Sequence, residues 1–116
     1  MAKSRDTVWE EWRDRVNMSP SELEDWLETE QSKSVGDTGS DGDESTGHHS
    51  GRWIIEIKRT DKDALSDDQW EWMRKVVGYV NRHCAQQPDG EIETSTWRYS
   101  LMNWGHDPLK DGGCAS

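Results

Sequence analysis

Residues 66–86 read SDDQWEWMRKVVGYVNRHCAQ, and this stretch decides the predicted fold. It opens with a capping box, in which Ser66 caps a helix and Gln69 reaches back to it. Apolar side chains then recur every three or four residues, as on a helix with one buried face. They are Trp70, Met73, Val77, Val80 and Cys84, and the stripe is widened by Trp72, Val76, Tyr79 and His83. We therefore expect a long central helix from about 67 to 86.

A second, shorter helix is predicted after the turn at 88–90. Thr94 or Ser95 can cap a helix over about 96–104, with Trp97, Leu101 and Trp104 on one face. Gly105 is placed as its C-terminal stop. Residues 111–116 have few apolar groups and are expected to be disordered.

Two helices are predicted before the central one. Asp6 can cap a helix over 7–16 that buries Val8, Trp9, Trp12 and Val16. Ser19, Pro20 and Glu22 then form a capping box with proline at the first helical position, so a helix should run over about 20–29. The second of these helices is too acidic to be a DNA-recognition helix.

The middle of the chain is low in complexity. Residues 30–49 are rich in glycine and acids and are predicted to be a flexible loop. The acids could hold calcium weakly, but their spacing does not match a calcium-binding loop, so a solvated linker is favoured. Ser50 can cap a helix over 51–60; the strand-forming residues of 53–57 leave a β-strand as the alternative. We favour the helix because no second strand is predicted nearby.

Length and composition indicate a single domain. The chain has 116 residues, of which 30% are hydrophobic, with eight tryptophans and no phenylalanine. A core built on tryptophan can offset the small apolar fraction, because each aromatic ring buries on the order of 150–250 Å². The predicted fold is an all-α bundle of about five helices, with its core at 7–29 and 50–110.

Charge and cysteine content indicate where an anion could bind and in which compartment the protein is expected. The net charge is −10, with 5 Lys/Arg against 13 Asp/Glu in residues 1–47 and 9 against 11 in residues 48–116. An anion site is therefore expected in the second half. There are two cysteines, no apolar signal segment at the start, and no run near the ~20 apolar residues of a membrane span. A cytoplasmic location with reduced cysteines is expected.

The sequence carries no catalytic motif. A nucleophile elbow, a phosphate loop, a dinucleotide fingerprint and a zinc-protease motif are all missing from it. Its histidines and cysteines lack zinc-finger spacing. We therefore expect a protein that is not an enzyme and has no cofactor and no metal site.

Candidate contact residues gather in the second half. Arg74, Gly78 and Arg82 fall on one helix face at spacings of four, and Gly78 costs the helix ~1 kcal/mol relative to alanine. A notch there could admit a neighbouring backbone, which is the favoured explanation, or a phosphate. The candidates for binding an anion or nucleic acid are Arg52, Arg74, Lys75, Arg82, Arg98, Tyr99, Asn103, His106 and Lys110.

Four segments, at 16–27, 45–51, 73–83 and 97–110, resemble a family of small uncharacterised proteins of prokaryotes and fungi. Members of that family often carry the label "DNA-binding protein", so the resemblance implies DNA binding. The chain departs from the family pattern at Trp53, which replaces a basic residue, at Asn81, which replaces a histidine, and at Cys84, which replaces an aliphatic residue. The alternative is a protein-interaction module, or a homodimer, that uses a tryptophan-rich surface.

Overall fold

The computed structural model describes residues 4–34 and 46–115. These residues form six α-helices: α1 (Arg5–Arg15), α2 (Pro20–Leu27), α3 (Glu30–Ser34), α4 (Thr46–Lys58), α5 (Asp67–Cys84) and α6 (Thr96–Asn103). A 3₁₀ turn, η1 (Lys62–Ala64), lies before α5. The prediction of an all-α bundle is confirmed, and the β-strand alternative for 53–57 is wrong because those residues lie inside α4.

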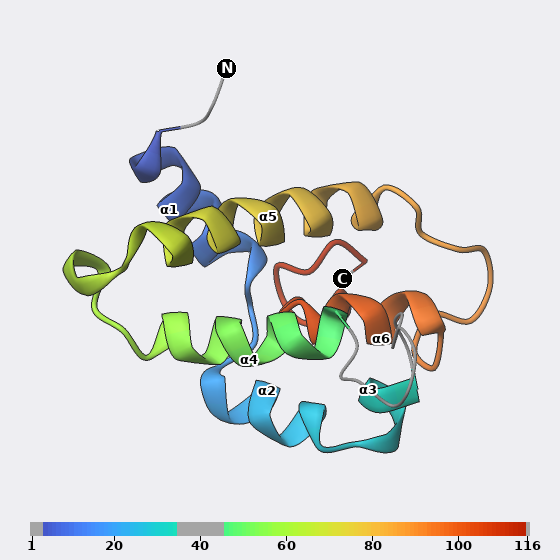
Figure 1. Cartoon of the computed structure of the whole chain (residues 1–116). Helices are drawn as coiled ribbons and strands as arrows, with labels where there is room; N and C mark the ends of the chain where they lie inside the picture. Colours follow the sequence, from blue (N-terminus) through green and yellow to red (C-terminus); the bar gives the residue numbers. More distant parts are fainter. Residues whose placement is uncertain (1–3, 35–45, 116) are drawn as a thin grey trace.

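The helices are arranged in three rough layers (Figure 1). Helix α1 packs on α5, helix α2 packs on α4, and α6 contacts α2, α3, α4 and α5. The core holds Val8, Leu23, Ile54, Met73, Val76, Val80 and Leu101, all of which are at most 1% exposed. Four tryptophans join it, Trp12, Trp70, Trp97 and Trp104, as the composition predicted.

The local helix signals agree with the predictions at most ends. Capping boxes at Ser19 and Ser66 start α2 and α5, and the Ser95 side chain caps α6. At α1 the predicted cap is wrong, because the Ser4 hydroxyl accepts the hydrogen bond from the Thr7 amide and Asp6 lies inside the helix. Gly105 follows α6 with φ of +80°, which is the left-handed conformation expected of a helix stop.

Both ends of the predicted flexible loop are helical. Residues 30–34 form α3. Ser32 is fully buried there; its hydroxyl donates to Asn103 Oδ1, and its carbonyl accepts from Asn103 Nδ2. Helix α4 begins at Thr46, so Ser50 is not its cap; the buried Ser50 hydroxyl instead accepts a hydrogen bond from Trp72 Nε1 at 3.0 Å. The rest of the predicted loop, residues 35–45, lies outside the described residues.

The C-terminal tail corrects two further predictions. Residues 111–115 fold back against the loop that follows α6, where the Ala115 amide donates to the Pro108 carbonyl at 2.9 Å. Cys84 and Cys114 form a disulfide, with their Cα atoms 6.0 Å apart. The tail is thus not disordered as far as residue 115, and the cysteines are not the free thiols that were predicted. Within the described ranges, helices long and apolar enough to cross a membrane do not occur.

Candidate functional site

A row of aromatic rings runs across α4, α5 and both ends of α6. The rings stack with centroid distances of 5.3 Å (Trp53–Trp72), 6.3 Å (Trp72–Trp104), 4.2 Å (Trp104–Tyr79), 5.1 Å (Tyr79–His83) and 6.3 Å (His83–Trp97). All five pairs are close to parallel, with interplanar angles of 26° or less. We call these six residues the aromatic row.

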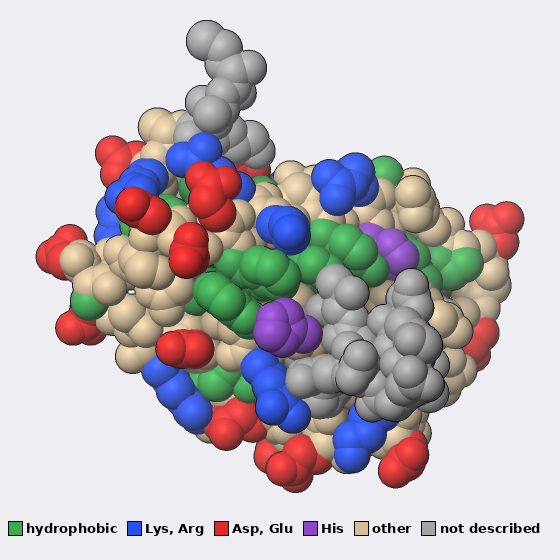
Figure 2. All heavy atoms as spheres, in the orientation of Figure 1, with side chains coloured by type: hydrophobic (Ala, Val, Ile, Leu, Met, Phe, Trp, Pro, Cys, Tyr) green, Lys and Arg blue, Asp and Glu red, His purple; other side chains and the backbone are tan. Residues whose placement is uncertain are grey.

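The helical repeat explains how α5 contributes to this row. Trp72, Tyr79 and His83 are separated by seven and four residues, so they lie along one line of the helix. They flank the buried positions Met73, Val76 and Val80 and are only half-buried themselves. Figure 2 shows a band of hydrophobic side chains on this face, with histidine and Lys/Arg side chains beside it. The row is therefore the edge of the core, left partly open to solvent.

Two cations of α5 lie beside the row. The Lys75 ammonium is 4.8 Å from the centroid of the Trp72 ring, which is a cation–π distance. Burial raises the pKa of the Tyr79 phenol. The hydrogen bond with Ser100 and the positive charge of Arg82 act in the opposite direction and lower it. Lys75 and Arg82 are both exposed. Both are predicted candidates, and the structure brings them together at one border of the row.

Gly78 lies between these cations. A Cβ at this position would have one described atom within 4 Å outside the helix backbone, Arg82 Nη1 at 3.2 Å. The favoured explanation of this glycine was close approach of a neighbouring backbone. It is wrong, because no backbone atom of another described segment lies within 4 Å of that Cβ position. The Arg82 guanidinium occupies the space above the glycine instead.

Arg74 and Arg52 lie apart from this border. Arg74 Nε is buried and has no hydrogen-bond partner among the described residues; its nearest acid is Glu71, with Oε1 3.9 Å away. Arg52 is exposed on α4, in a hollow that Glu24, Glu28 and Lys33 also line. The two acids balance the two bases, so this hollow has no excess of positive charge to attract an anion.

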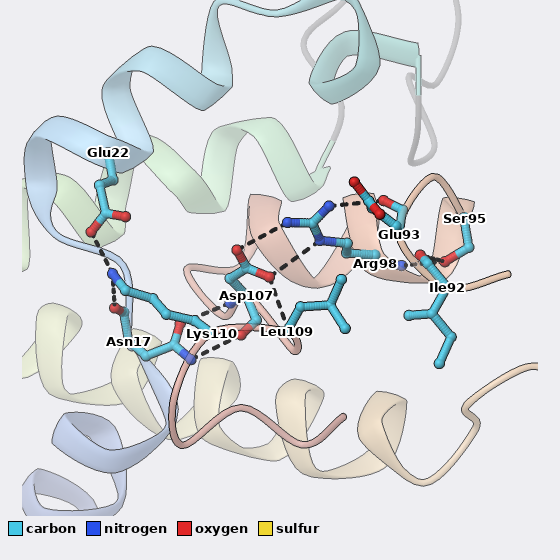
Figure 3. Close-up of polar contacts among 9 residues, drawn as sticks. All are labelled: Asn17, Glu22, Ile92, Glu93, Ser95, Arg98, Asp107, Leu109 and Lys110. Carbon is cyan, nitrogen blue, oxygen red and sulfur yellow. Dashed lines mark hydrogen bonds and ion pairs between the residues drawn. The ribbon is translucent and has the colours of Figure 1, made fainter. Parts of the chain in front are cut away.

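The C-terminal cations are engaged within the fold (Figure 3). Arg98 Nε and Nη2 each lie 3.2 Å from an oxygen of Asp107, and its Nη1 donates to the Glu93 carbonyl at 2.8 Å. Lys110 Nζ donates to the Asn17 carbonyl at 2.9 Å and to Glu22 Oε1 at 2.5 Å. The bond from Lys110 also lowers the pKa of the Glu22 carboxyl. Both cations are therefore bonded to other parts of the protein and stabilise the fold.

The remaining three candidates are also used inside the protein. Asn103 is 1% exposed, and its Oδ1 accepts from Trp26 Nε1 at 2.8 Å and from the Ser32 hydroxyl at 2.5 Å. His106 is 1% exposed, with Nδ1 2.5 Å from the Arg15 carbonyl. Tyr99 is half-buried against Trp26, with ring centroids 5.3 Å apart. The prediction of Asn103 and His106 as contact residues is therefore corrected, because both side chains face the core.

Sequence reasoning missed most of the aromatic row as a surface. The helical spacing predicts Trp72, Tyr79 and His83 as a widening of the core stripe. One available signal was the position of Trp72, Tyr79 and His83 at the border of that stripe, where side chains are only partly covered. His83 Nε2 is buried without a hydrogen-bond partner among the described residues, and burial lowers the pKa of this imidazole.

One group of described side chains could hold a metal ion. Ligand atoms of Cys84, His106 and Cys114 all lie within 4.8 Å of one another. They come from the end of α5, from the loop after α6 and from the tail, so their spacing in the sequence gave no sign of the group.

Comparison with known proteins gives a family match. Residues 11–102 match the model of a protein family that is described as a protein of unknown function, DUF3140. Neither a curated protein nor a solved structure matches the chain. The matched residues run from the C-terminal half of α1 through α2, α3, α4 and α5 to the first seven residues of α6.

Proposed function

The chain belongs to the DUF3140 family, which is defined by a domain of unknown function, and we propose that it is a non-enzymatic module that binds single-stranded nucleic acid through the aromatic row. The observation that carries this proposal is the open edge of the row with Lys75 and Arg82 beside it. Unpaired bases stack on aromatic side chains, at about 1–3 kcal/mol per base, while cations next to them contact the phosphates. Duplex DNA keeps its bases stacked and should bind less well.

The charge distribution supports a local rather than a global attraction. The net charge of −10 lies mainly in residues 1–47, whereas residues 48–116 are close to balanced. Charges farther away than the Debye length of ~8 Å are largely screened at physiological salt. The proposed contact is therefore short, with few phosphates, and its affinity is expected to be modest.

A second candidate is a protein partner or a second copy of the chain. It is favoured by the same net charge, which opposes any polyanion, and by the composition of the row, because Trp, Tyr and Arg are enriched at the centres of protein interfaces. Light scattering of the purified chain distinguishes a homodimer from a monomer by its mass.

Nucleic-acid binding is tested by titrating fluorescent oligothymidylate and a duplex of the same length at several salt concentrations. Phosphate contacts make log K fall linearly with log salt. The variant Lys75→Glu should weaken binding and reduce the salt slope by about one. Lys62→Glu is the matched control, because Lys62 lies over Trp9, away from the row.

The measurement can reject the proposal in two ways. Absence of binding at low salt would remove nucleic acid as the ligand. Binding that Lys75→Glu and Lys62→Glu weaken equally would show only a general charge effect and would separate the row from the contact. Trp53→Ala completes the set, since loss of a stacking ring should weaken binding without changing the salt slope.

A further inference from the structure

We propose that Cys84, His106 and Cys114 bind a zinc ion when the disulfide between the two cysteines is reduced. Their ligand atoms lie within 4.8 Å of one another, although the residues come from three separate segments. Two thiolate sulfurs and one imidazole nitrogen form a common zinc ligand set. This site is separate from the aromatic row in its ligands and does not depend on the proposed function.

The hydrogen bonds of His106 select the nitrogen that a metal needs. Its Nδ1 is 2.5 Å from the Arg15 carbonyl, and a carbonyl can only accept, so Nδ1 carries the proton. The lone pair of the neutral ring is then on Nε2, which lies 3.2 Å from the Cys114 amide nitrogen. Zinc-binding histidines are commonly fixed in this way, by donating from the other ring nitrogen to a carbonyl.

The tail already lies against the second nitrogen of this ring. His106 is 1% exposed. Nε2 accepts a hydrogen bond of 3.2 Å from the Cys114 amide. A metal would take this lone pair, and because Cys114 is exposed, its amide can bond to water instead.

Contacts other than the disulfide hold the tail close to His106. The Gly113 amide donates to the Lys110 carbonyl at 2.7 Å, and the Ala115 amide donates to the Pro108 carbonyl. A Cβ at Gly113 would lie 2.4 Å from the Pro108 carbonyl oxygen, so this approach requires glycine. The three ligands should therefore stay together after reduction.

The redox step is an ordinary thiol–disulfide exchange. The thiolate of a small-molecule thiol attacks one cysteine sulfur, which breaks the disulfide and leaves a mixed disulfide. A second small-molecule thiolate attacks the mixed disulfide, so that two cysteine thiols and one small-molecule disulfide are formed. Zinc binding then displaces the two thiol protons to solvent. Because Cys114 is exposed, water can fill the fourth position, and the oxidised protein has no thiolate to offer.

The test uses the full chain in reduced and oxidised forms, titrated with cobalt chloride and then with zinc chloride. The reduced protein should bind one cobalt ion with a thiolate-to-cobalt absorption band that zinc abolishes, and the oxidised protein should show no such band. In the reduced, zinc-loaded protein, the ¹⁵N resonance of His106 Nε2 should shift, while Nδ1 should remain protonated. This NMR readout needs no substitution of a buried residue.

Two sets of variants complete the experiment. Cys114→Ser lies on the exposed tail and should weaken zinc binding at least about 10–100-fold. The matched control is His49→Gln, which removes a histidine whose Nε2 accepts a hydrogen bond from Trp53 Nε1, and it should leave the affinity unchanged. Reduced protein that binds no cobalt, cobalt binding without the thiolate band, or equal affinity in Cys114→Ser would overturn the proposal.

Discussion

Gly105 allows a direct test of how tightly the end of α6 packs against the corner between α1 and α2. Its φ of +80° is in the left-handed region, and a Cβ there would lie 2.9 Å from Val16 Cγ1 and 3.3 Å from Ile54 Cγ2. Val16 and Ile54 are 2% and 0% exposed, so neither side chain can swing away into solvent. Gly105→Ala should therefore destabilise the fold through both backbone strain and overpacking.

Gly90 is the matched control because it isolates the backbone term. Its φ is +88°, and a Cβ there would meet no described atom within 4 Å. Gly90→Ala should lower the free energy of unfolding by about 1–2 kcal/mol, the cost of a left-handed non-glycine residue. Gly105→Ala adds about 1–3 kcal/mol of overpacking, giving a total of about 2–5 kcal/mol.

Urea denaturation followed by circular dichroism and tryptophan fluorescence measures both losses. The informative quantity is the difference between the two variants, because strain from the positive φ cancels in it. If the two losses agree within about 0.5 kcal/mol, the contact with Val16 relaxes at no cost. The close packing that we describe at this corner would then be refuted.

Three further predictions concern buried polar groups and the disulfide. Asn103→Ala should lower the free energy of unfolding by about 2–4 kcal/mol, because it leaves the Trp26 N–H and the buried Ser32 hydroxyl without partners. Asn81→Ala is the control: it removes an exposed bond to Arg15 and should change stability by less than about 0.5 kcal/mol. Equal losses of the two variants in urea denaturation would contradict this prediction. Burial lowers the folded-state pKa of His83 and of His106, so the unfolded state binds more protons below the ordinary imidazole pKa of about 6.5, and stability should fall as pH drops below 6.5. The slope is at most about 1.4 kcal/mol per pH unit for each histidine, and denaturation of His83→Gln and the parent between pH 7 and 5 should show a shallower loss in the variant. Reduction of the disulfide in metal-free buffer should cost about 3–4 kcal/mol, from the loop of 30 residues that it closes; an unchanged urea midpoint would count against it.

The helices could be predicted because their signals are local. Capping boxes and the spacing of apolar residues depend on side chains within a few residues, and they gave α2, α5 and α6 nearly as observed. Helix α3 was not predictable in this way. Its five polar residues are ordered by Asn103, which lies 71 positions away from Ser32 in the sequence, and no local pattern records such a bond.

The candidate site was predicted only in part, for a related reason. A sequence shows that a side chain is polar or aromatic, but it does not show whether another segment satisfies or covers it. Lys75 and Arg82 remained exposed, whereas Arg98 found Asp107 and His106 found the Arg15 carbonyl. The cysteine–histidine group arises from the turn of the tail, which short-range spacing cannot reveal.

The segment 97–110 is one of the four that carry the family resemblance, and the structure gives it a structural role. The Asn17 amide side chain donates to the Asp107 carbonyl and accepts from the Asp107 amide, while the Gly105 carbonyl accepts from the Met18 amide. These bonds join the segment after α6 to the link between α1 and α2, which are more than 80 residues apart in the chain. We call these bonds between Asn17 or Met18 and the backbone of residues 105–107 the long-range clasp.

This role has a consequence for where a ligand should be sought. A residue already bonded within the core must lose those bonds to bind something else, and an unsatisfied buried group costs about 1–3 kcal/mol. Lys75 and Arg82 have no such cost, because they are exposed on α5 beside the half-buried rings of Trp72 and Tyr79. Substitutions in the long-range clasp should therefore reduce binding only in proportion to the loss of folded protein. Substitutions at Lys75 should reduce binding while lowering stability by no more than about 1 kcal/mol, the value of its cation–π contact with Trp72.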